Sequence, residues 1–265
     1  MANLFFPQLS SGALAQYPIR KTQVARTVKN ILPDGRMILL PDPGAARFVW
    51  ELSYSDLAAA DMAALQFLYS ACCGPLRAFT FIDPTDNMLA WSSDFAKQTW
   101  QISSEIKVSS GAQDPEGNNA AFTVTNLGQA PEQISQILAV PASYRYCFSV
   151  YALANRTSNI TLALAGASAQ ASKTFVVGPN WARLSFAEKL ADPGFTLTVS
   201  ISLDPGQQVQ LYGIQLEPQL APSRYRPTGQ RGGVYPNAHW ATDEFVVAAQ
   251  ATNLFSTAFS IETSI

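Results

Sequence analysis

The residues of this chain that are best suited to binding a ligand are aromatic. Five of them lie in or beside runs of alternating polar and apolar residues, where a ring can occupy an exposed face of a strand. An exposed ring offers a flat apolar surface to the C–H groups of a sugar. The residues that we expect to be candidates for stacking on a sugar are Trp100, Tyr144, Tyr146, Tyr151 and Trp181.

Core packing is the competing interpretation for these rings, because aromatic side chains are mostly buried. Trp100 and Trp181 both open strand-like runs, which suits a place in a core. Tyr144 and Tyr146 share one face of a strand by the period of two, and one face of that strand must be core. Both interpretations stay open at the level of sequence.

Catalysis has no comparable support. His239 is the only histidine, and its position beside Trp240 suggests a structural role. The chain has no Gly-x-Ser-x-Gly, phosphate-loop or His-Glu-x-x-His motif, and no pair of carboxylates is distinguished for glycoside hydrolysis. We therefore expect a protein that is not an enzyme and has no catalytic residues.

A locally basic stretch near the N-terminus is the second candidate site. One interpretation is a contact with an acidic neighbouring subunit, and the other is a solvated hairpin edge that charge protects against aggregation. The residues of this possible subunit contact are Arg20, Lys21, Arg26, Lys29 and Arg36.

The composition indicates a folded protein with a sizeable core. Of 265 residues, 48% are hydrophobic and 14% are charged, and the formal net charge is −2. These values argue against wholesale disorder and against a nucleic-acid partner, which would need a basic face. We expect no signal peptide and no transmembrane helix, because the N-terminus lacks a basic segment followed by a long apolar run, and no stretch of about 20 apolar residues occurs.

The three cysteines do not predict a disulfide framework. Their number is odd, and Cys72 and Cys73 are adjacent, too few and too close for a zinc site of the usual spacing. Together with Cys147 they are expected to be three reduced, buried thiols.

The first secondary-structure elements predicted from the sequence lie in residues 18–82 and are mostly strands. Residues 18–41 predict a hairpin with its turn at Pro33-Asp34-Gly35, and residues 47–53 predict a further strand. Ser55 is a plausible N-cap, and apolar residues at helical spacing predict a helix over residues 56–71 that ends at Gly74-Pro75. Residues 77–82 then predict a strand.

The pattern changes from residue 87 to residue 228. Short alternating runs follow one another, separated by turn signals such as Asp192-Pro-Gly194 and Asp204-Pro-Gly206. This spacing is typical of an antiparallel sandwich, and about 140 residues suit one jelly roll. Strands are expected at residues 100–108, 120–125, 134–139, 144–153, 160–165, 173–177, 182–186, 195–203 and 208–216.

The remaining residues return to the first pattern. Residues 243–247 and 258–262 read as two strands, which cannot bury a face alone. We expect them to complete the first segment. The fold class is therefore mostly β, with a discontinuous β-rich assembly domain containing one helix (1–87 and 231–265) and an inserted antiparallel jelly-roll β-sandwich (88–230).

Two parts of the chain resemble known families. Residues 47–86 show a strand, a capped helix, a glycine and a strand ending in Asp83-Pro84, and they resemble the core of phage distal-tail and minor-tail proteins. Residues 88–228 resemble the jelly-roll modules, similar to family 4 and 9 carbohydrate-binding modules, that phages fuse to tail components. The residues that carry this second resemblance are Trp91, Ser92, Phe95, Trp100, Asp114–Gly117, Tyr144–Tyr151, Trp181-Ala-Arg183, Gly213–Glu217 and Tyr225–Thr228.

The resemblance implies a structural component of a phage or phage-like tail tip or baseplate, located in the virion tail. Its partners would be copies of itself in a ring around the tail tube, the tube and other tail-tip proteins, with the jelly roll facing outward toward host-surface glycans. The alternative is a free-standing glycan-binding accessory protein. No nucleic acid and no membrane insertion are expected.

No cofactor is expected, with one alternative that the related modules suggest. Those modules often hold a structural calcium, and Glu217 and Asp94 could supply the oxygen ligands that this hard cation prefers. However, no loop with clustered carboxylates occurs. The competing interpretation is that Glu217 accepts hydrogen bonds from backbone near the edge of the sandwich.

Overall fold

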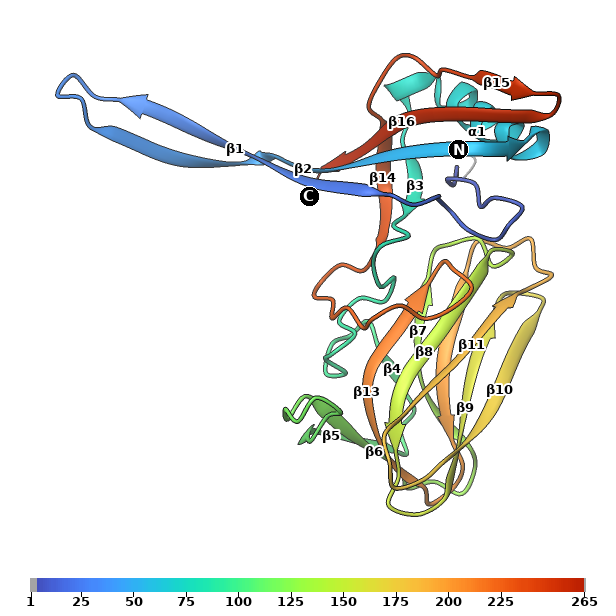
Figure 1. Cartoon of the computed structure of the whole chain (residues 1–265). Helices are drawn as coiled ribbons and strands as arrows, with labels where there is room; N and C mark the ends of the chain where they lie inside the picture. The colour runs from blue at the N-terminus through green and yellow to red at the C-terminus, as the bar shows by residue number, and fades with distance from the viewer. Residues whose placement is uncertain (1–3, 265) are drawn as a thin grey trace. The chain divides into compact units, whose positions relative to one another are not determined.

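The computed structural model describes residues 4–264 and contains two compact units (Figure 1). The first unit joins two distant parts of the sequence, Met1–Phe81 and Tyr235–Ile265, and the sandwich unit is Ile82–Val234. The sequence predicts these two divisions at residues 88 and 230, whereas the structure has them at residues 82 and 234. Both units are built from strands, and the described residues contain a single α-helix. The predicted fold class, mostly β with one helix and an antiparallel sandwich, is confirmed.

A six-stranded sheet forms the first unit. Its strands follow the order β1-β2-β16-β14-β3, with β15 paired to β16. The C-terminal strand β16 therefore lies inside the sheet, hydrogen-bonded along β2, which explains why the two ends of the chain fold together. The strands are β1 (Arg20–Ile31), β2 (Met37–Ala58), β3 (Phe79–Ile82), β14 (Val234–Trp240), β15 (Ala248–Ala251) and β16 (Leu254–Ser264).

The helix α1 (Ala59–Cys72) begins later than the sequence predicts. Ser55 is not its N-cap, because the chain stays extended in β2 through Ala58. Strand β16 pairs with this part of β2, and Ser55 lies in a bulge of the pairing, where its N–H donates to Gln16 Oε1 at 2.8 Å. A partner strand some 200 residues away in the sequence thus overrides a local helix-start signal.

Aromatic rings fill the core of the first unit. Trp50 lies 4.9 Å from Phe81, and Trp240 lies 4.6 Å from Phe259, measured between ring centroids. Helix α1 covers one side with buried side chains at helical spacing; Leu65 and Leu68 belong to the apolar pattern of the sequence, whereas Ala60 of that pattern is exposed. The buried residues of the helix are Met62, Leu65, Leu68 and Cys72.

Strands β1 and β2 extend beyond the sheet as a hairpin that projects from the rest of the first unit (Figure 1). We call residues 26–42 the arm. The predicted turn is confirmed: Gly35 has a φ of +81°, and its N–H donates to the Leu32 carbonyl at 2.9 Å. The return strand does not stop before residue 47, because β2 runs without interruption from the arm into the sheet, and the strand predicted at 47–53 is part of it.

The sandwich unit consists of two five-stranded antiparallel sheets, ordered β10-β9-β12-β7-β4 and β11-β8-β13-β6-β5. Buried aliphatic residues of both sheets, such as Val150, Leu162, Ile201 and Leu211, form its core. The strands are β4 (Gln101–Ile102), β5 (Ile106–Ala112), β6 (Ala121–Asn126), β7 (Glu132–Leu138), β8 (Arg145–Leu153), β9 (Ser158–Ala165), β10 (Gln170–Val177), β11 (Ala182–Lys189), β12 (Leu197–Leu203) and β13 (Gln208–Glu217).

Two of the predicted strands are wrong. The run 100–108 is not one strand, because a turn at residues 103–105 separates β4 and β5, which belong to different sheets. Residues 243–247 form no strand; the strands of this region are β14 and β15 on either side. Strand β14 was not predicted. It contains Pro236, which has no N–H to donate to a neighbouring strand and therefore argues against a strand in the sequence.

The three cysteines are free, and Cys72 and Cys147 are buried. Cys73 is exposed, contrary to the prediction of three buried thiols. It follows the last helical residue with a φ of +53°, so the chain turns at this position and the side chain points to solvent. Within residues 4–264, no helix is long and apolar enough to cross a membrane.

Candidate functional site

The outer face of the β11-β8-β13 sheet carries a row of partly exposed side chains. In these strands, alternate residues such as Val150 and Leu211 are buried against the other sheet. Their neighbours point the opposite way. Strand register places Arg183 of β11, Tyr151 of β8 and Tyr212 of β13 side by side. All three are half-buried, so they form a continuous surface across three strands.

Three tyrosines meet in this row. The rings of Tyr151 and Tyr212 lie 6.0 Å apart, and Tyr225 packs edge-on against Tyr212 at 5.2 Å. Gly213 makes this packing possible, because a Cβ at its position would lie 3.1 Å from Tyr151 and 3.2 Å from Tyr225. We call Tyr151, Tyr212 and Tyr225 the tyrosine cluster.

Arg183 borders the tyrosine cluster with a positive charge. Its guanidinium carbon lies 5.2 Å from the ring centroid of Tyr151, a cation–π distance, and its Nη2 donates to Ser149 Oγ at 3.1 Å. Its Nε–H has no hydrogen-bond acceptor among the described residues. Trp181, two residues earlier, is half-buried and lies just before β11 begins at Ala182.

The segment that follows β13 holds Tyr225 in place. Gln215 and Glu217 are fully buried beneath it: Gln215 Oε1 accepts from the Arg226 N–H at 2.8 Å, and Glu217 Oε2 accepts from the Ser223 N–H at 3.0 Å. The hydroxyl of Tyr225 is hydrogen-bonded to Ser92 at 3.1 Å. These bonds fix the segment, and with it one side of the tyrosine cluster.

Burial raises the pKa of two phenols of the cluster, those of Tyr212 and Tyr225. It raises the pKa of Tyr212 to about 12, and the nearby carboxylates of Glu116 and Asp114 act in the same direction. Burial also raises the pKa of Tyr225, against the opposing effect of its hydrogen bond with Ser92. Both shifts disfavour the negatively charged form of these two phenols, and the guanidinium of Arg183 lies at the border of the cluster.

The other three aromatic candidates do not join this row. Trp100 is only 6% exposed; its Nε1 donates to the Trp91 carbonyl at 2.9 Å, and its ring packs on Phe95. Tyr146 is fully buried, and its hydroxyl donates to the Pro141 carbonyl. Tyr144 is half-buried and stacks on Tyr146.

Of the residues that the sequence marks as candidates, Tyr151 belongs to the tyrosine cluster, whereas Arg183, Tyr212 and Tyr225 were not among the candidates. Arg183 follows Trp181 at the period of two, which was a usable signal. Tyr212 alternates with buried Leu211 in the same way. Nothing local marks Tyr225, which lies outside any strand and reaches the face through the path of the chain after β13.

The two carboxylates considered for calcium are engaged separately. Both oxygens of Glu217 accept hydrogen bonds, from the Ser223 N–H and from Gln219 Nε2 at 2.8 Å. Asp94 accepts from the Ala96 N–H and lies 3.6 Å from Lys97 Nζ. Among the described residues, no three His, Cys, Asp or Glu side chains are arranged to hold a metal ion. Glu217 thus has the backbone-binding role of the competing interpretation.

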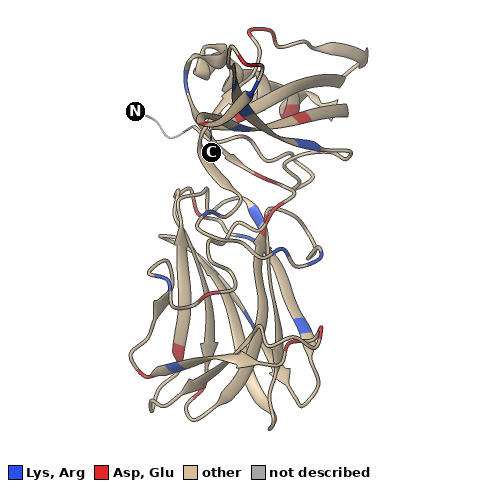
Figure 2. Ribbon diagram, turned by 90° about the vertical axis from the view of Figure 1, so that its left-hand side faces the viewer, with Lys and Arg blue, Asp and Glu red and all other residues tan. Residues whose placement is uncertain are grey.

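The basic residues of the N-terminal hairpin mostly have partners within the first unit. Arg20 pairs with Glu51 at 3.5 Å, Arg26 with Asp42, and Arg36 with Asp34 at 2.6 Å. Lys21 Nζ lies over the ring of Phe48 at 4.6 Å. Segments with lysine or arginine and segments with aspartate or glutamate are both scattered over the ribbon of each unit (Figure 2). The free positive charge expected on this hairpin is thus largely compensated. The remaining member of the set is Lys29, an exposed residue of the arm.

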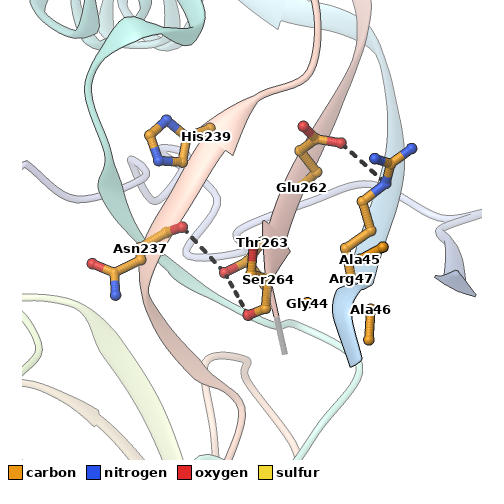
Figure 3. Close-up of a pocket in the computed structure, with 9 residues that line it drawn as sticks. All are labelled: Gly44, Ala45, Ala46, Arg47, Asn237, His239, Glu262, Thr263 and Ser264. Atoms are coloured by element: carbon orange, nitrogen blue, oxygen red, sulfur yellow. Dashed lines mark hydrogen bonds and ion pairs between the residues drawn. The ribbon is translucent and has the colours of Figure 1, made fainter. Parts of the chain in front are cut away.

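A polar pocket of about 390 Å³ lies at the end of the first unit's sheet (Figure 3). Asn237 and His239 of β14 line one side, and Arg47 of β2, paired with Glu262 at 3.4 Å, lines the other. His239 Nδ1 is 2.9 Å from the Pro75 carbonyl, so the ring is held by backbone. The hydroxyl of Thr263, which also lines the pocket, donates to the Asn237 carbonyl at 3.1 Å rather than to this histidine.

No protein-family model matches the chain, and no curated protein matches it by sequence. Several solved structures are similar in fold. The C-terminal family 22 carbohydrate-binding module of Clostridium thermocellum Xyn10B is 17% identical over 54% of this chain and 99% of its own, with a TM-score of 0.42. The CBM22-1 xylan-binding domain of Paenibacillus barcinonensis Xyn10C is 17% identical over 50% and 94%, with a TM-score of 0.41.

A phage protein is also among the similar structures. The enzymatically active domain of bacteriophage CBA120 tailspike protein 4 is 9% identical over 52% of this chain, with a TM-score of 0.40. This chain spans only 22% of that tailspike chain. At these identities and scores, the similarities identify neither a ligand nor an activity for the present protein.

Proposed function

We propose that the sandwich unit binds a carbohydrate on the outer face of its β11-β8-β13 sheet. The observation that carries this proposal is the tyrosine cluster beside Arg183. Partly exposed rings offer apolar surface to sugar C–H groups, while phenol and guanidinium groups offer hydrogen bonds to hydroxyls. A hydroxylated ring with two apolar faces matches this combination.

The rigidity of the face supports the proposal. The rings pack on one another, Arg183 is tied to Ser149, and Tyr225 is tied to Ser92. Side chains that are already ordered lose little conformational entropy when a ligand binds. The cluster is therefore better suited to binding than isolated surface tyrosines would be.

Affinity electrophoresis of the full chain in gels containing polysaccharides tests the proposal, followed by calorimetry with the retarding glycan. We expect Tyr212→Ala to weaken binding about tenfold or more, equivalent to about 1.4 kcal/mol. Phe175→Ala is the matched control, because Phe175 is a half-buried ring on β10 of the other sheet. Equal binding by wild type and Tyr212→Ala would contradict the proposed face.

A second candidate role is structural. The first unit carries an arm with uncovered apolar side chains, which is unusual for a chain that acts alone. Together with the resemblance of residues 47–86, this supports a component of a phage or phage-like tail tip, a distal-tail protein that displays the sandwich from a ring around the tail tube. In this role the protein resides in the virion tail and has no catalytic function.

Mass spectrometry of purified tails tests the structural role directly. We expect peptides of both units at a stoichiometry of several copies per particle. If intact tails contain no peptide of this chain, the structural role is wrong. Glycan binding by the sandwich unit is tested separately, by the affinity electrophoresis described above.

A further inference from the structure

The positive charge of Arg183 has no ion-pair partner among the described residues. Its one hydrogen-bond acceptor there is a neutral hydroxyl, Ser149 Oγ, at 3.1 Å, and its Nε–H has none. None of the ion pairs in the described chain includes Arg183. Since a guanidinium carries five N–H donors, Ser149 satisfies only a small part of this group.

Two contacts hold the guanidinium at the edge of the tyrosine cluster. Arg183 on β11 lies opposite Tyr151 on β8 in the strand register, and its guanidinium carbon is 5.2 Å from the ring centroid of Tyr151. The hydrogen bond to Ser149 is the second contact. The residue is half-buried, and a charge partly removed from water interacts more strongly with an opposite charge than a fully solvated one does. Arg183 is therefore an ordered cation within reach of a ligand that packs on the cluster.

Carboxylates lie at the other end of the same row. Strand β13 pairs with β6 up to Leu211 and Phe122, so the turn before β6, which contains Asp114 and Glu116, lies next to Tyr212. Burial raises the pKa of Tyr212 to about 12, and these two carboxylates add to that effect. The row thus runs from a positive charge on β11 to negative charges beside β13. An anionic group on a ligand is favoured at the β11 end.

The carboxylate of Glu217 lies on the same face but is not a partner of Arg183. It is in register with Cys147 and has no exposed surface, because the segment after β13 covers it. Its oxygens accept from the Ser223 N–H at 3.0 Å and from Gln219 Nε2 at 2.8 Å. A ligand on the face can therefore contact Arg183 without contacting this carboxylate.

We propose that the carbohydrate bound on this face is acidic and that Arg183 binds its anionic group. A carboxylate and a sulfate present the same kind of negatively charged oxygens to a guanidinium, and charge-assisted hydrogen bonds are stronger than those to a neutral hydroxyl. The tyrosine cluster packs on the apolar surface of the sugar, while Arg183 distinguishes an acidic sugar from a neutral one. This inference rests on the proposed carbohydrate binding and names the chemical class of the ligand.

Paired polysaccharides test the inference by affinity electrophoresis of the full chain. Polygalacturonate, alginate and hyaluronate are each compared with their carboxyl-reduced forms, and dextran sulfate is compared with dextran, at about 0.15 M NaCl. We expect the chain to bind at least one acidic polysaccharide about tenfold more tightly than its neutral partner. The carboxylate pairs and the sulfate pair show which anionic group is bound.

Substitutions of Arg183 separate its charge from its packing. Arg183→Gln should remove the preference for the acidic member of a pair, whereas damage to folding or ring packing would weaken binding to both members alike. Arg183→Lys should keep part of the preference, because lysine keeps the charge without the planar fork. Lys189→Gln is the matched control. It makes the same change in charge at the last residue of β11, about 20 Å away along the strand.

Three results would overturn the inference. They are equal binding of the acidic and neutral members of every pair, a preference for the acidic member that Arg183→Gln leaves unchanged, and a preference that Lys189→Gln reduces as much as Arg183→Gln does. In each case, binding that Tyr212→Ala weakens would still support the proposed carbohydrate site. If no polysaccharide, acidic or neutral, retards the chain, the proposed carbohydrate binding fails, and this inference fails with it.

Discussion

Gly213 shows how one residue without a side chain shapes the candidate site. It lies between the rings of Tyr151 and Tyr225 with a φ of +65°, a conformation that L side chains rarely adopt. Strand β13 has a register shift there, between Tyr212 and Gln215 in its pairing with β8. The register shift lies next to Tyr212, whose ring packs against Tyr225. The geometry of the tyrosine cluster therefore depends on the backbone conformation of β13 as well as on the three side chains.

Replacing Gly213 by alanine should therefore affect both stability and binding. We expect Gly213→Ala to cost about 1 kcal/mol or more of unfolding free energy, because φ is positive and the added Cβ meets two rings. Carbohydrate retardation should weaken as the rings separate. Urea unfolding and affinity electrophoresis measure the two effects. Gly178→Ala is the control, since a Cβ there meets nothing within 4 Å, and equal losses in both variants would refute the argument.

The buried thiol of Cys147 should make the free energy of unfolding depend on pH in the alkaline range. Burial, assisted by the carboxylate of Glu217, raises the pKa of its thiol from 9.0 to about 12. Between these values the folded state keeps a proton that the unfolded state has lost, so stability falls as pH rises above about 9, by about 1.4 kcal/mol per pH unit for one proton. Well below pH 9 both the folded and the unfolded state hold this proton, so the thiol of Cys147 does not make stability depend on pH there.

Urea unfolding of wild type and Cys147→Ala at pH 7, 8, 9 and 10 measures this contribution. We expect a shallower decline between pH 9 and pH 10 in the variant, whatever its stability at pH 7. The slopes matter rather than the absolute values, because removal of the sulfur also changes core packing. Identical slopes in the two proteins would show that Cys147 does not titrate in this way.

At the scale of elements, Asp192 joins two turns of the sandwich. Its carboxylate accepts from the N–H groups of Ser168 and Ala169, at 2.6 Å and 3.1 Å, in the turn between β9 and β10. It also accepts from the Gly194 N–H at 2.7 Å, in the connection between β11 and β12. The backbone donors, with that of Ser168 first, lower the pKa of Asp192 below its ordinary value.

This arrangement predicts a loss of stability in acid. Because the folded pKa is lowered, the contribution of Asp192 is complete above its ordinary pKa and disappears as the pH falls through the folded value. Asp192→Asn should lower the urea midpoint at pH 7 and decline less between pH 5 and pH 3 than wild type. Parallel curves for the two proteins over this range would contradict the assignment.

Also at the scale of elements, local sequence patterns predicted that most strands and the helix exist, but they predicted the first and last residues of these elements less accurately. Strand β1 occupies the predicted residues, and the arm turns at Pro33-Asp34-Gly35, because turn chemistry is local. The start of α1 was wrong, since the pairing of β2 with β16 keeps Ser55 extended. A single sequence does not show which distant strand will supply such a partner.

At the scale of the whole molecule, the chain has two separate cores. Leu65 is buried in the first unit and Ile201 in the sandwich unit, each with no exposed surface. Since each unit has its own core, we expect two unfolding transitions rather than one.

Paired core substitutions can assign these transitions. Leu65→Ala and Ile201→Ala should each cost about 2–5 kcal/mol, and each should lower only one of the two calorimetric transitions. Differential scanning calorimetry of the three proteins measures this effect. If both substitutions lower the same transition equally, the two units unfold as one cooperative body.

The candidate site was predictable only in part, and the reason is its long-range construction. Alternation along β8 places Tyr151 on one face of its strand, but it does not show whether that face is exposed. Trp100 and Tyr146 have similar local patterns and are buried. Exposure depends on what covers each face, which is a property of the assembled sheets.

The sequence by itself determined the β-rich fold class, the turns, and the return of the last residues to the first unit's pattern, because residue periodicity and turn chemistry act locally. Only the tertiary structure decided which rings meet. It placed Tyr225 beside Tyr212, buried Glu217 beneath the segment after β13, and left the arm and the outer face of α1 uncovered. These outcomes follow from strand pairing and coverage between residues far apart in the sequence, for which no local pattern exists.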